Sequence, residues 1–408
     1  MSLLLTLAWR NLWRNKRRTL ITSSSVFFAF LLATALISFA KGFQQQLTES
    51  LIRQETGYMQ VQDAMYLEEP SMDHIFEYGE ELKKAIGEIG SDIDYTVPRI
   101  SGFSLAARDI TTKPAMVNGI DPEMEDRLRN LSSNITEGEM FSAGDDYAVI
   151  AKGLADMLHI RTGDTLILIG QGFQAITATA MFRVGGIIDF TIPELNNRMV
   201  FLPLGEAQNY FAAGNRLTSL IIMPEHDEKI CKVAERLQEM LDSEWYAVRT
   251  WDELMPDMVE LMQMQDTVYR LITWVFYVIV GFGIFGTIVT MLYERMREFG
   301  IMLSLGMKRS RLAIVGLVET IFIGIIGITA GFVAGIPLVL FFRMFPVRFT
   351  GGSAEYIMNF GMEPVFPFAF DPMIFLEQAM AVFLITVLIG FYAMRKIYRT
   401  DMLDASRQ

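Results

Sequence analysis

The sequence lacks the features that mark a metal centre or a disulfide-stabilised fold. It has one cysteine in 408 residues, Cys231, so no intrachain disulfide can form and cysteine usage does not reveal the compartment. We interpret Cys231 as a small apolar residue of a helix. The three histidines, His74, His159 and His226, are widely separated and fit no metal-ligand spacing. We therefore predict no metal site and interpret all three as surface residues.

Motifs of catalysis and of nucleotide binding are also missing. No G-x-x-x-x-G-K-[ST] phosphate loop occurs, so we do not expect this chain to hold ATP in that way. No G-x-S-x-G elbow occurs, and acidic pairs such as Glu68-Glu69 are more typical of solvated faces than of acid–base pairs. The net charge of −12 argues against a nucleic-acid binder, which needs a basic surface. We predict that the chain is not an enzyme and binds no nucleic acid.

The composition instead indicates a membrane protein with a soluble part. Hydrophobic residues make up 51% of the chain and charged residues 20%, and the mean hydropathy is +0.30. This is too apolar for an ordinary soluble protein and too charged for a pure bundle of membrane helices. We expect membrane segments joined to a sizeable soluble domain.

Four segments are long and apolar enough to cross a membrane, which takes about 20 residues for a hydrocarbon core of about 30 Å. The predicted spans are 19–40, 268–293, 312–342 and 373–394. A signal peptide is the alternative for the first segment, with the basic stretch before it as its flank. We favour an uncleaved span, because the segment is longer than the roughly 7–15 apolar residues of a signal peptide.

Lysine and arginine near the ends of the spans predict the orientation. They are concentrated in 1–18, in 294–311 and in 395–408. We therefore place these three segments and both termini in the cytoplasm. The segments 41–267 and 343–372 then lie outside it. The stretch 1–18 is predicted to be an interfacial helix, with Trp9 and Trp13 on one face and arginines on another.

The segment 41–267 carries 38 acidic and 18 basic residues, an excess that we interpret as a device for solubility. Helical spacing of apolar residues continues beyond the first span and precedes the second one. We expect two helical stalks that could link domain motion to membrane motion; ordinary packed helices are the alternative. The stripes comprise Phe43, Leu47 and Leu51 on the first stalk, and Met258, Leu261, Met262, Gln265 and Tyr269 on the second.

Between the stalks, helical and strand patterns alternate, which predicts an α+β domain with room for two lobes. Predicted helices are 77–89 and 227–241. A turn is predicted at Asp121-Pro122. Predicted strands are 58–62, 116–120, 165–170, 175–188, 198–202, 217–223 and 245–249.

The loop between the second and third spans is the most distinctive motif. A short apolar piece, 301–305, is flanked by charges, and Gly306 is placed to cap the end of a helix. Such a helix has little core of its own and would suit a groove in a partner. The alternative from composition alone is a charged cytoplasmic loop.

This loop resembles the E-R-x-R-E-I-G-x-x-x-A-L-G-A motif of ABC transporter permeases of the MacB/FtsX/LolE type. Phe299, Ser304 and Met307 are mild departures from the motif. The opening 8–19 and the order of span, large outer domain and three further spans also resemble this family, so the resemblance covers the whole chain. The residues that match the motif are Glu294, Arg295, Arg297, Glu298, Gly300, Leu305 and Gly306.

The resemblance implies a membrane α-helical fold with a MacB-like periplasmic core between the first and second spans. It implies that the loop is a coupling helix docking on a separate cytoplasmic ATPase, which would carry ATP and Mg. It also implies a second permease, identical or a sister chain, and a place in the bacterial inner membrane. This chain itself would bind no cofactor.

Several segments of the outer domain are most similar to the lipoprotein-releasing (LolC/LolE) branch. For that branch the resemblance implies extraction of a lipoprotein from the inner membrane toward a periplasmic carrier. Efflux of an amphiphilic small molecule or peptide, or an FtsX-like non-transporting signal transmitter, are the alternatives. The similar segments are 43–62, 117–125, 135–138, 151–155 and 163–166, and the candidate carrier-binding loops are 170–175 and 191–197.

Two features of the third span also have candidate roles. Glu319 matches a family acid, and a carboxylate there is costly unless it faces protein, water or the interface. We favour contact within the bundle or with the N-terminal helix over simple snorkelling. Gly327, Gly331 and Gly335 form a small-xxx-small face for close helix packing, either inside the subunit or across a dimer.

The stalk faces suggest a lateral cleft that admits acyl chains, because aromatic residues and adaptable methionines gather on them. Simple packing of the two stalks against each other is the alternative. The candidate cleft residues are Phe39, Phe43, Leu47, Met258, Met262 and Tyr269.

Overall fold

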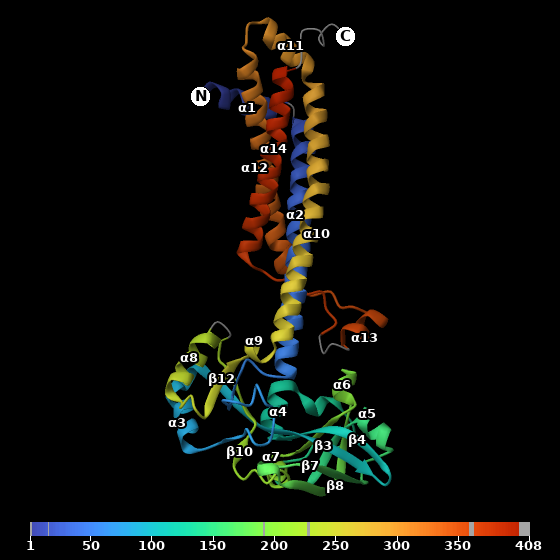
Figure 1. Ribbon diagram of the computed structural model, residues 1–408. Helices are drawn as coiled ribbons and strands as arrows, with labels where there is room; N and C mark the ends of the chain where they lie inside the picture. The colour runs from blue at the N-terminus through green and yellow to red at the C-terminus, as the bar shows by residue number, and fades with distance from the viewer. Residues whose placement is uncertain (1, 15, 191, 227–228, 359–362, 400–408) are drawn as a thin grey trace. The chain divides into compact units, whose positions relative to one another are not determined.

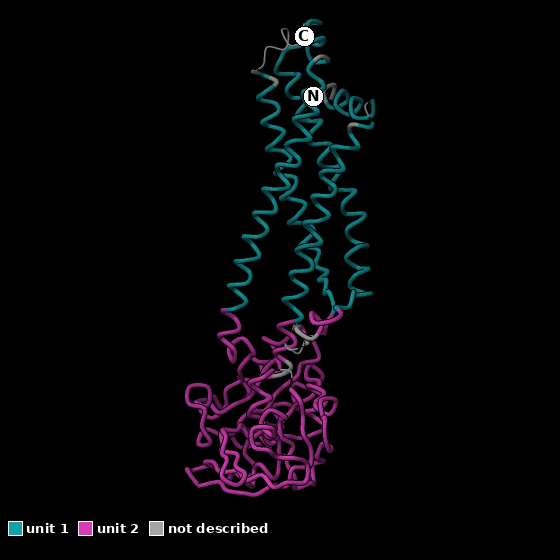
Figure 2. Tube along the Cα trace, turned by 90° about the vertical axis from the view of Figure 1, so that its right-hand side faces the viewer, with its two compact units in different colours: residues 1–46, 261–349, 365–408 teal, residues 47–260, 350–364 magenta. Residues whose placement is uncertain are grey.

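The computed structural model describes residues 2–14, 16–190, 192–226, 229–358 and 363–399. The chain divides into two compact units, coloured in Figure 2. Unit 1 contains the long apolar helices and unit 2 contains the β-sheet (Figure 1). The boundaries are residues 1–46, 261–349 and 365–408 for unit 1, and 47–260 and 350–364 for unit 2.

Four helices in the described part of the chain are long and apolar enough to cross a membrane, which confirms the predicted fold class. Each predicted span falls within one of them. Two of the helices have 39 residues, about 58 Å at 1.5 Å per residue, and so exceed the thickness of a bilayer core. The four helices are α2 (Lys16–Gln54), α10 (Pro256–Glu294), α12 (Arg309–Met344) and α14 (Pro372–Arg399). Two shorter helices of unit 1 are α1 (Ser2–Arg14), which precedes α2, and α11 (Met296–Ser304), which lies between α10 and α12.

The glycine stripe of α12 packs against α2 within the same chain. A Cβ atom at Gly327 would lie 2.7 Å from the Cβ of Val26 and 2.8 Å from the carbonyl oxygen of Ser23. A Cβ at Gly331 would lie 2.4 Å from a ring carbon of Phe30, whereas at the third glycine, Gly335, the contact is ordinary. Of the two alternatives for this stripe, the structure shows contact inside the subunit. Glycine is required at Gly327 and Gly331 because any side chain at these positions would keep the backbones of α12 and α2 from approaching so closely.

Unit 2 is built on one extended mixed sheet that contains a closed ring of strands. The order β3-β4-β9-β6-β8 returns to β3 through β7, which pairs with both β8 and β3. Most pairs are antiparallel, but β4 with β9 and β6 with β8 are parallel. The ring strands are β3 (Ile93–Arg108), β4 (Thr111–Ile120), β6 (Tyr147–Ala151), β7 (Thr165–Gln171), β8 (Thr177–Ile188) and β9 (Met199–Pro203).

Unit 2 is one compact unit, and two of its hydrophobic clusters lie along this sheet. One core fills the ring, with Ile100, Val117 and Leu166 fully buried. The other lies between three strands outside the ring and two amphipathic helices. These elements are β1 (Met59–Asp63), β11 (Ser219–Pro224), β12 (Tyr246–Thr250), α3 (Glu80–Ile89) and α8 (Ile230–Met240).

The remaining elements of unit 2 are short. The strands β2 and β10 form a separate two-stranded sheet, and β5 lies at one end of the main sheet beside β8. They are β2 (Phe76–Glu77), β5 (Ile135–Gly138), β10 (Arg216–Leu217), α4 (Pro122–Arg129), α5 (Lys152–Leu158), α6 (Pro193–Asn196), α7 (Leu204–Tyr210), α9 (Trp251–Leu254) and α13 (Gly352–Met358).

The structure corrects three local predictions. The pair Asp121-Pro122 begins helix α4 rather than forming a turn, because the Asp121 carboxylate caps the amides of Glu123 and Met124 at 3.1 Å and proline fits the first helical position. The helix predicted from residue 77 begins at Glu80, since the preceding residues form β2. Strand β3 was missed entirely, although it is the longest strand. Residues 227–228 of the second predicted helix lie outside the described residues.

A buried charge cluster ties the residue after α2 to the sheet. Glu125 of α4 is fully buried and accepts hydrogen bonds from Arg99 of β3, through Nε at 3.1 Å, and from Arg129 at 2.5 Å. Arg99 also donates to the backbone oxygen of Glu55 at 2.8 Å. Burial alone would raise the pKa of Glu125, but Arg129 and Arg99 outweigh it and hold that pKa below its usual range. Burial likewise lowers the pKa of Arg129 to about 10.

Replacing Glu125 with glutamine should destabilise unit 2 by about 3–5 kcal/mol at neutral pH, because two buried guanidinium groups lose their counter-charge. The wild-type pKa is lower folded than unfolded, so the carboxylate contributes its full stability above about pH 5. That contribution is lost as the pH falls through the lowered pKa. Thermal unfolding from pH 7 to pH 3 should therefore show a steeper loss in the wild type than in Glu125→Gln.

The matched control is Glu123→Gln on the exposed face of the same helix, which should leave the midpoint nearly unchanged. Equal midpoints for the two variants at pH 7 would show that the buried cluster does not stabilise unit 2.

Candidate functional site

The loop between α10 and α12 folds into the short helix α11, as its apolar piece predicted. Its end is a Schellman motif: the amide of Gly306 donates to the oxygen of Leu303 at 3.0 Å and that of Met307 to the oxygen of Met302 at 3.1 Å. Gly306 has φ +92°, a conformation that favours glycine. The predicted cap is confirmed, and it fixes the direction in which the chain leaves α11.

Helix α11 has one face packed in the bundle and one face uncovered. Phe299 is 2% exposed and belongs to the core shared by the long helices. Ile301 is 54% exposed and Leu305, the residue that caps the helix, is 81% exposed. The inner face holds the helix in place, and the outer face presents apolar side chains to whatever approaches this end of the bundle.

The anchor of α11 is a buried ion pair inside the bundle. Arg295, at the N-terminal cap of α11, donates to a carboxylate oxygen of Glu319 on α12, and the two residues are 2% and 1% exposed. Asn11 of α1 donates to the other carboxylate oxygen at 2.8 Å. The contact favoured in the sequence for Glu319 is thus present, with both the bundle and the N-terminal helix. One carboxylate joins α1, α11 and α12.

A second ion pair and an aromatic contact hold α1 on the same junction. The Nη2 atom of Arg14 donates to Oε2 of Glu298 at 3.1 Å, where both side chains are largely exposed. The ring of Trp9 meets that of Phe322 of α12 edge to face, with centroids 5.5 Å apart. The predicted interfacial helix therefore packs against the bundle through one of its two tryptophans.

The residues predicted for ATPase coupling thus occupy different environments. Arg295 turns inward to Glu319, and Gly300 is buried. Glu298 faces Arg14, whereas Leu305 and Gly306 lie at the surface. Glu294 ends α10, and the side chain of Arg297 lies outside the described part of the structure. Sequence reasoning could not separate the inward arginine from its outward neighbours, because all belong to one charged motif.

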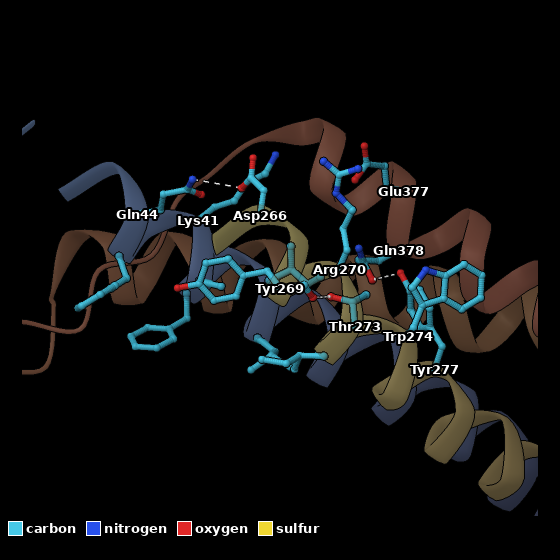
Figure 3. Close-up of a pocket in the computed structure, with 16 residues that line it drawn as sticks. Lys41, Gln44, Asp266, Tyr269, Arg270, Thr273, Trp274, Tyr277, Glu377 and Gln378 are labelled. Carbon is cyan, nitrogen blue, oxygen red and sulfur yellow. Dashed lines mark hydrogen bonds between the residues drawn. The ribbon is translucent and has the colours of Figure 1, made fainter. Parts of the chain in front are cut away.

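At the other end of unit 1, α2, α10 and α14 enclose a cleft of about 750 Å³ (Figure 3). The predicted cleft residues Phe39, Phe43 and Tyr269 line it. Leu47, Met258 and Met262 do not, and the first two belong to unit 2. The rest of the lining comprises Leu36, Ile37, Ala40, Lys41, Gln44, Asp266, Arg270, Ile272, Thr273, Trp274, Tyr277, Glu377 and Gln378.

The lining of this cleft combines apolar side chains with polar and charged ones. Gln44 donates to Asp266 at 3.1 Å, and the Tyr277 hydroxyl donates to Gln378 at 2.6 Å. In Figure 3 the side chains of Arg270 and Glu377 point toward one another across α10 and α14. The contribution of α14 to this cleft could not be predicted from the sequence, because only the tertiary structure brings that helix to the stalk residues. Among the described residues no cluster of potential metal ligands occurs.

Prediction and structure agree with comparisons to known proteins. Residues 19–240 match the family described as MacB-like periplasmic core domain, and residues 270–402 match the FtsX-like permease C-terminal family. The chain is 22% identical over 233 residues to the lipoprotein-releasing system transmembrane protein LolC of Xylella fastidiosa, covering 55% of this chain and 56% of that protein. It therefore spans about half the length of that relative.

Two further matches cover different parts of the chain. An uncharacterised ABC transporter permease of Methanocaldococcus jannaschii is 20% identical over 343 residues, or 82% of this chain and 83% of that one. The crystal structure of the extracellular domain of the transporter YknZ from Gram-positive bacteria aligns with a TM-score of 0.35 at 15% identity, covering 48% of this chain and all of that domain.

The fold and the loop define a multi-pass membrane protein with an α+β domain inserted after its first span. The chain belongs to the family of ABC transporter permeases of the MacB/FtsX/LolC type, since the MacB-like family match alone extends over more than half of its length.

The buried anchor can be tested with a double-mutant cycle. We expect Glu319→Gln and Arg295→Met each to destabilise the bundle by about 3–5 kcal/mol, because each leaves a buried partner without its counterpart. The double variant should cost less than the sum, since no uncompensated charge remains. Thermal unfolding in detergent measures the loss, and protease cleavage within α11 reports its release.

Arg14→Gln provides the comparison, because it removes a cation from an exposed pair and should cost at most about 1 kcal/mol. Additive effects of Glu319→Gln and Arg295→Met would contradict a direct coupling between them.

Proposed function

We propose that this chain is the non-catalytic permease subunit of an ABC transporter, driven by a separate cytoplasmic ATPase that carries the ATP and Mg²⁺. The observation that supports this most is helix α11, which exposes Ile301 and Leu305 while Arg295 and Phe299 fix it to the bundle. A helix held rigidly on one side and apolar on the other suits a groove in a partner. The absence of a phosphate loop in the sequence fits a division of labour in which another chain binds nucleotide.

The rigid mounting supports a mechanical role for the helix. A force applied to α11 would reach α12 through Arg295 and Glu319, and α1 through Asn11 and Arg14. Helices α2 and α10 each continue without a break into unit 2, so movement of the bundle would be passed to the outer domain. We place the chain in the bacterial inner membrane, with the termini and α11 in the cytoplasm, on the basis of its lysine and arginine distribution.

A second permease, identical or a sister chain, would cover part of α10. This helix presents many apolar side chains outward within the monomer, among them Leu271, Val275 and Ile279, each at least 60% exposed. Lipid would cover whatever the second subunit leaves open.

Substituting aspartate for Ile301 and Leu305 together should weaken binding of the ATPase at least tenfold, because both charges would be desolvated in the groove. Co-purification with the ATPase encoded nearest to this chain's gene, followed by titration, measures the affinity. Since both side chains are exposed in the isolated subunit, its melting temperature should not change.

Ser310→Asp, an exposed change just beyond the same loop, is the control and should bind normally. Wild-type ATPase affinity and stimulation in the double aspartate variant would rule out α11 as the docking element.

For the substrate we propose a lipoprotein, extracted from the membrane and handed to a periplasmic carrier. The cleft between α2, α10 and α14 supports this, because its apolar lining residues suit acyl chains and its charged ones suit a polar head. The lipoprotein-releasing relative supports it as well. The turn at 170–175, between β7 and β8, stays a candidate carrier-binding loop; Thr191, in the other candidate, lies outside the described residues.

Efflux of an amphiphilic small molecule or peptide is the second candidate, favoured by the MacB-like family match. The same cleft would admit such a substrate. A non-transporting transmitter is a third candidate, but it would leave this cleft without a role.

A photo-crosslinker at Phe43 should capture lipoproteins in cells, because this residue lines the cleft. Capture should fall several-fold when lipidation is blocked or the ATPase is inactivated. The control position is Val333 of α12, which is 73% exposed but does not line the cleft. Equal lipoprotein capture at Phe43 and Val333 would refute the cleft, and capture of small amphiphiles alone would favour efflux.

A further inference from the structure

A second cleft, of about 950 Å³, lies in unit 1 between the start of α2 and the last third of α10, beside the end of α1. It is separate from the cleft of Figure 3, since the two have no lining residue in common. The proposed transport mechanism does not use it. Its lining comprises Arg14, Lys16, Arg17, Ile21, Thr22, Phe282, Gly283, Gly286, Thr287, Thr290, Met291 and Glu294.

The mouth of this cleft is cationic. Arg14, Lys16 and Arg17 line it and are exposed, and Glu294 is the carboxylate in the lining. Arg14 also pairs with Glu298 at 3.1 Å, which leaves Lys16 and Arg17 as the cations best placed for an anionic ligand. A phosphate group is the common anion that such a pair recognises.

Beyond its mouth the cleft has a groove beside the apolar side chains of Ile21, Phe282 and Met291. A Cβ atom placed on Gly283 or Gly286 would meet no other atom within 4 Å, so these glycines leave open space along α10. The hydroxyls of Thr287 and Thr290 donate to carbonyl oxygens of their own helix at 2.6 and 2.8 Å. The apolar surface of this groove therefore comes from those three side chains beside the glycines, with Phe282 72% exposed next to them.

We propose that this cleft binds one anionic phospholipid, with its phosphate against Lys16 and Arg17 and an acyl chain along the groove at Gly283 and Gly286. A cationic mouth that continues into an apolar groove matches a molecule with an anionic head and a hydrocarbon tail. A soluble phosphate would leave the groove unfilled. The second permease proposed above would lie against α10 at Leu271, Val275 and Ile279, which do not line this cleft.

Native mass spectrometry of the full chain, delipidated in detergent, tests the proposal. Titration with dioleoylphosphatidylglycerol should show one lipid bound more tightly than dioleoylphosphatidylcholine. Lys16→Gln combined with Arg17→Gln should weaken binding of the anionic lipid about thirtyfold, because the phosphate loses both of its cations. Gly283→Leu and Gly286→Leu should each weaken it similarly without any change of charge, since leucine fills the groove.

Arg10→Gln is the control, because Arg10 is an exposed cation of α1 that does not line the cleft. Variants are compared only if their melting temperatures match the wild type. Wild-type affinity in both leucine variants, or an equal loss in Arg10→Gln, would show diffuse attraction to a basic surface and overturn the site. A lipid-free dimer with a disulfide across Gly286→Cys would show that a second copy occupies the cleft, which also overturns it.

Discussion

The ion pair between Arg295 and Glu319 is the interaction on which the rest of the bundle depends. Two charges buried in a membrane helix bundle are stable only with each other and with satisfied hydrogen bonds, and Asn11 supplies one of these at 2.8 Å. The pair therefore specifies one arrangement of α1, α11 and α12. The exposed face of α11 has a defined direction because its inner end is fixed in this way.

Helices α2 and α10 line two clefts in unit 1, at different points along their lengths. The first takes its lining from Leu36–Gln44 and Asp266–Tyr277, with α14, and the second from Arg14–Thr22 and Phe282–Glu294. Because both clefts lie between the same helices, a change in the separation of α2 and α10 would alter both.

The sequence predicted the architecture well and the tertiary contacts only in part. Long apolar runs located the spans, and the apolar piece before Gly306 located α11, because these signals are local. Glu319 was expected to contact the bundle or α1, but its partner Arg295 was grouped with the outward charges, since the loop motif does not reveal which side chain is buried. Strand β3 was missed because its apolar residues do not mark its buried face: Phe103 and Leu105 are exposed, whereas Gly102 and Ser104 are buried.

Hydrogen–deuterium exchange on the chain with and without its ATPase, in the same detergent, tests the central claim most directly. If α11 is the docking element, the amides of Met296–Ser304 should become strongly protected on complex formation, while those on the exposed face of α14 stay unchanged. Protection should appear with an ATPase that binds but does not hydrolyse ATP. Unchanged exchange in α11 within a stable complex would contradict the account.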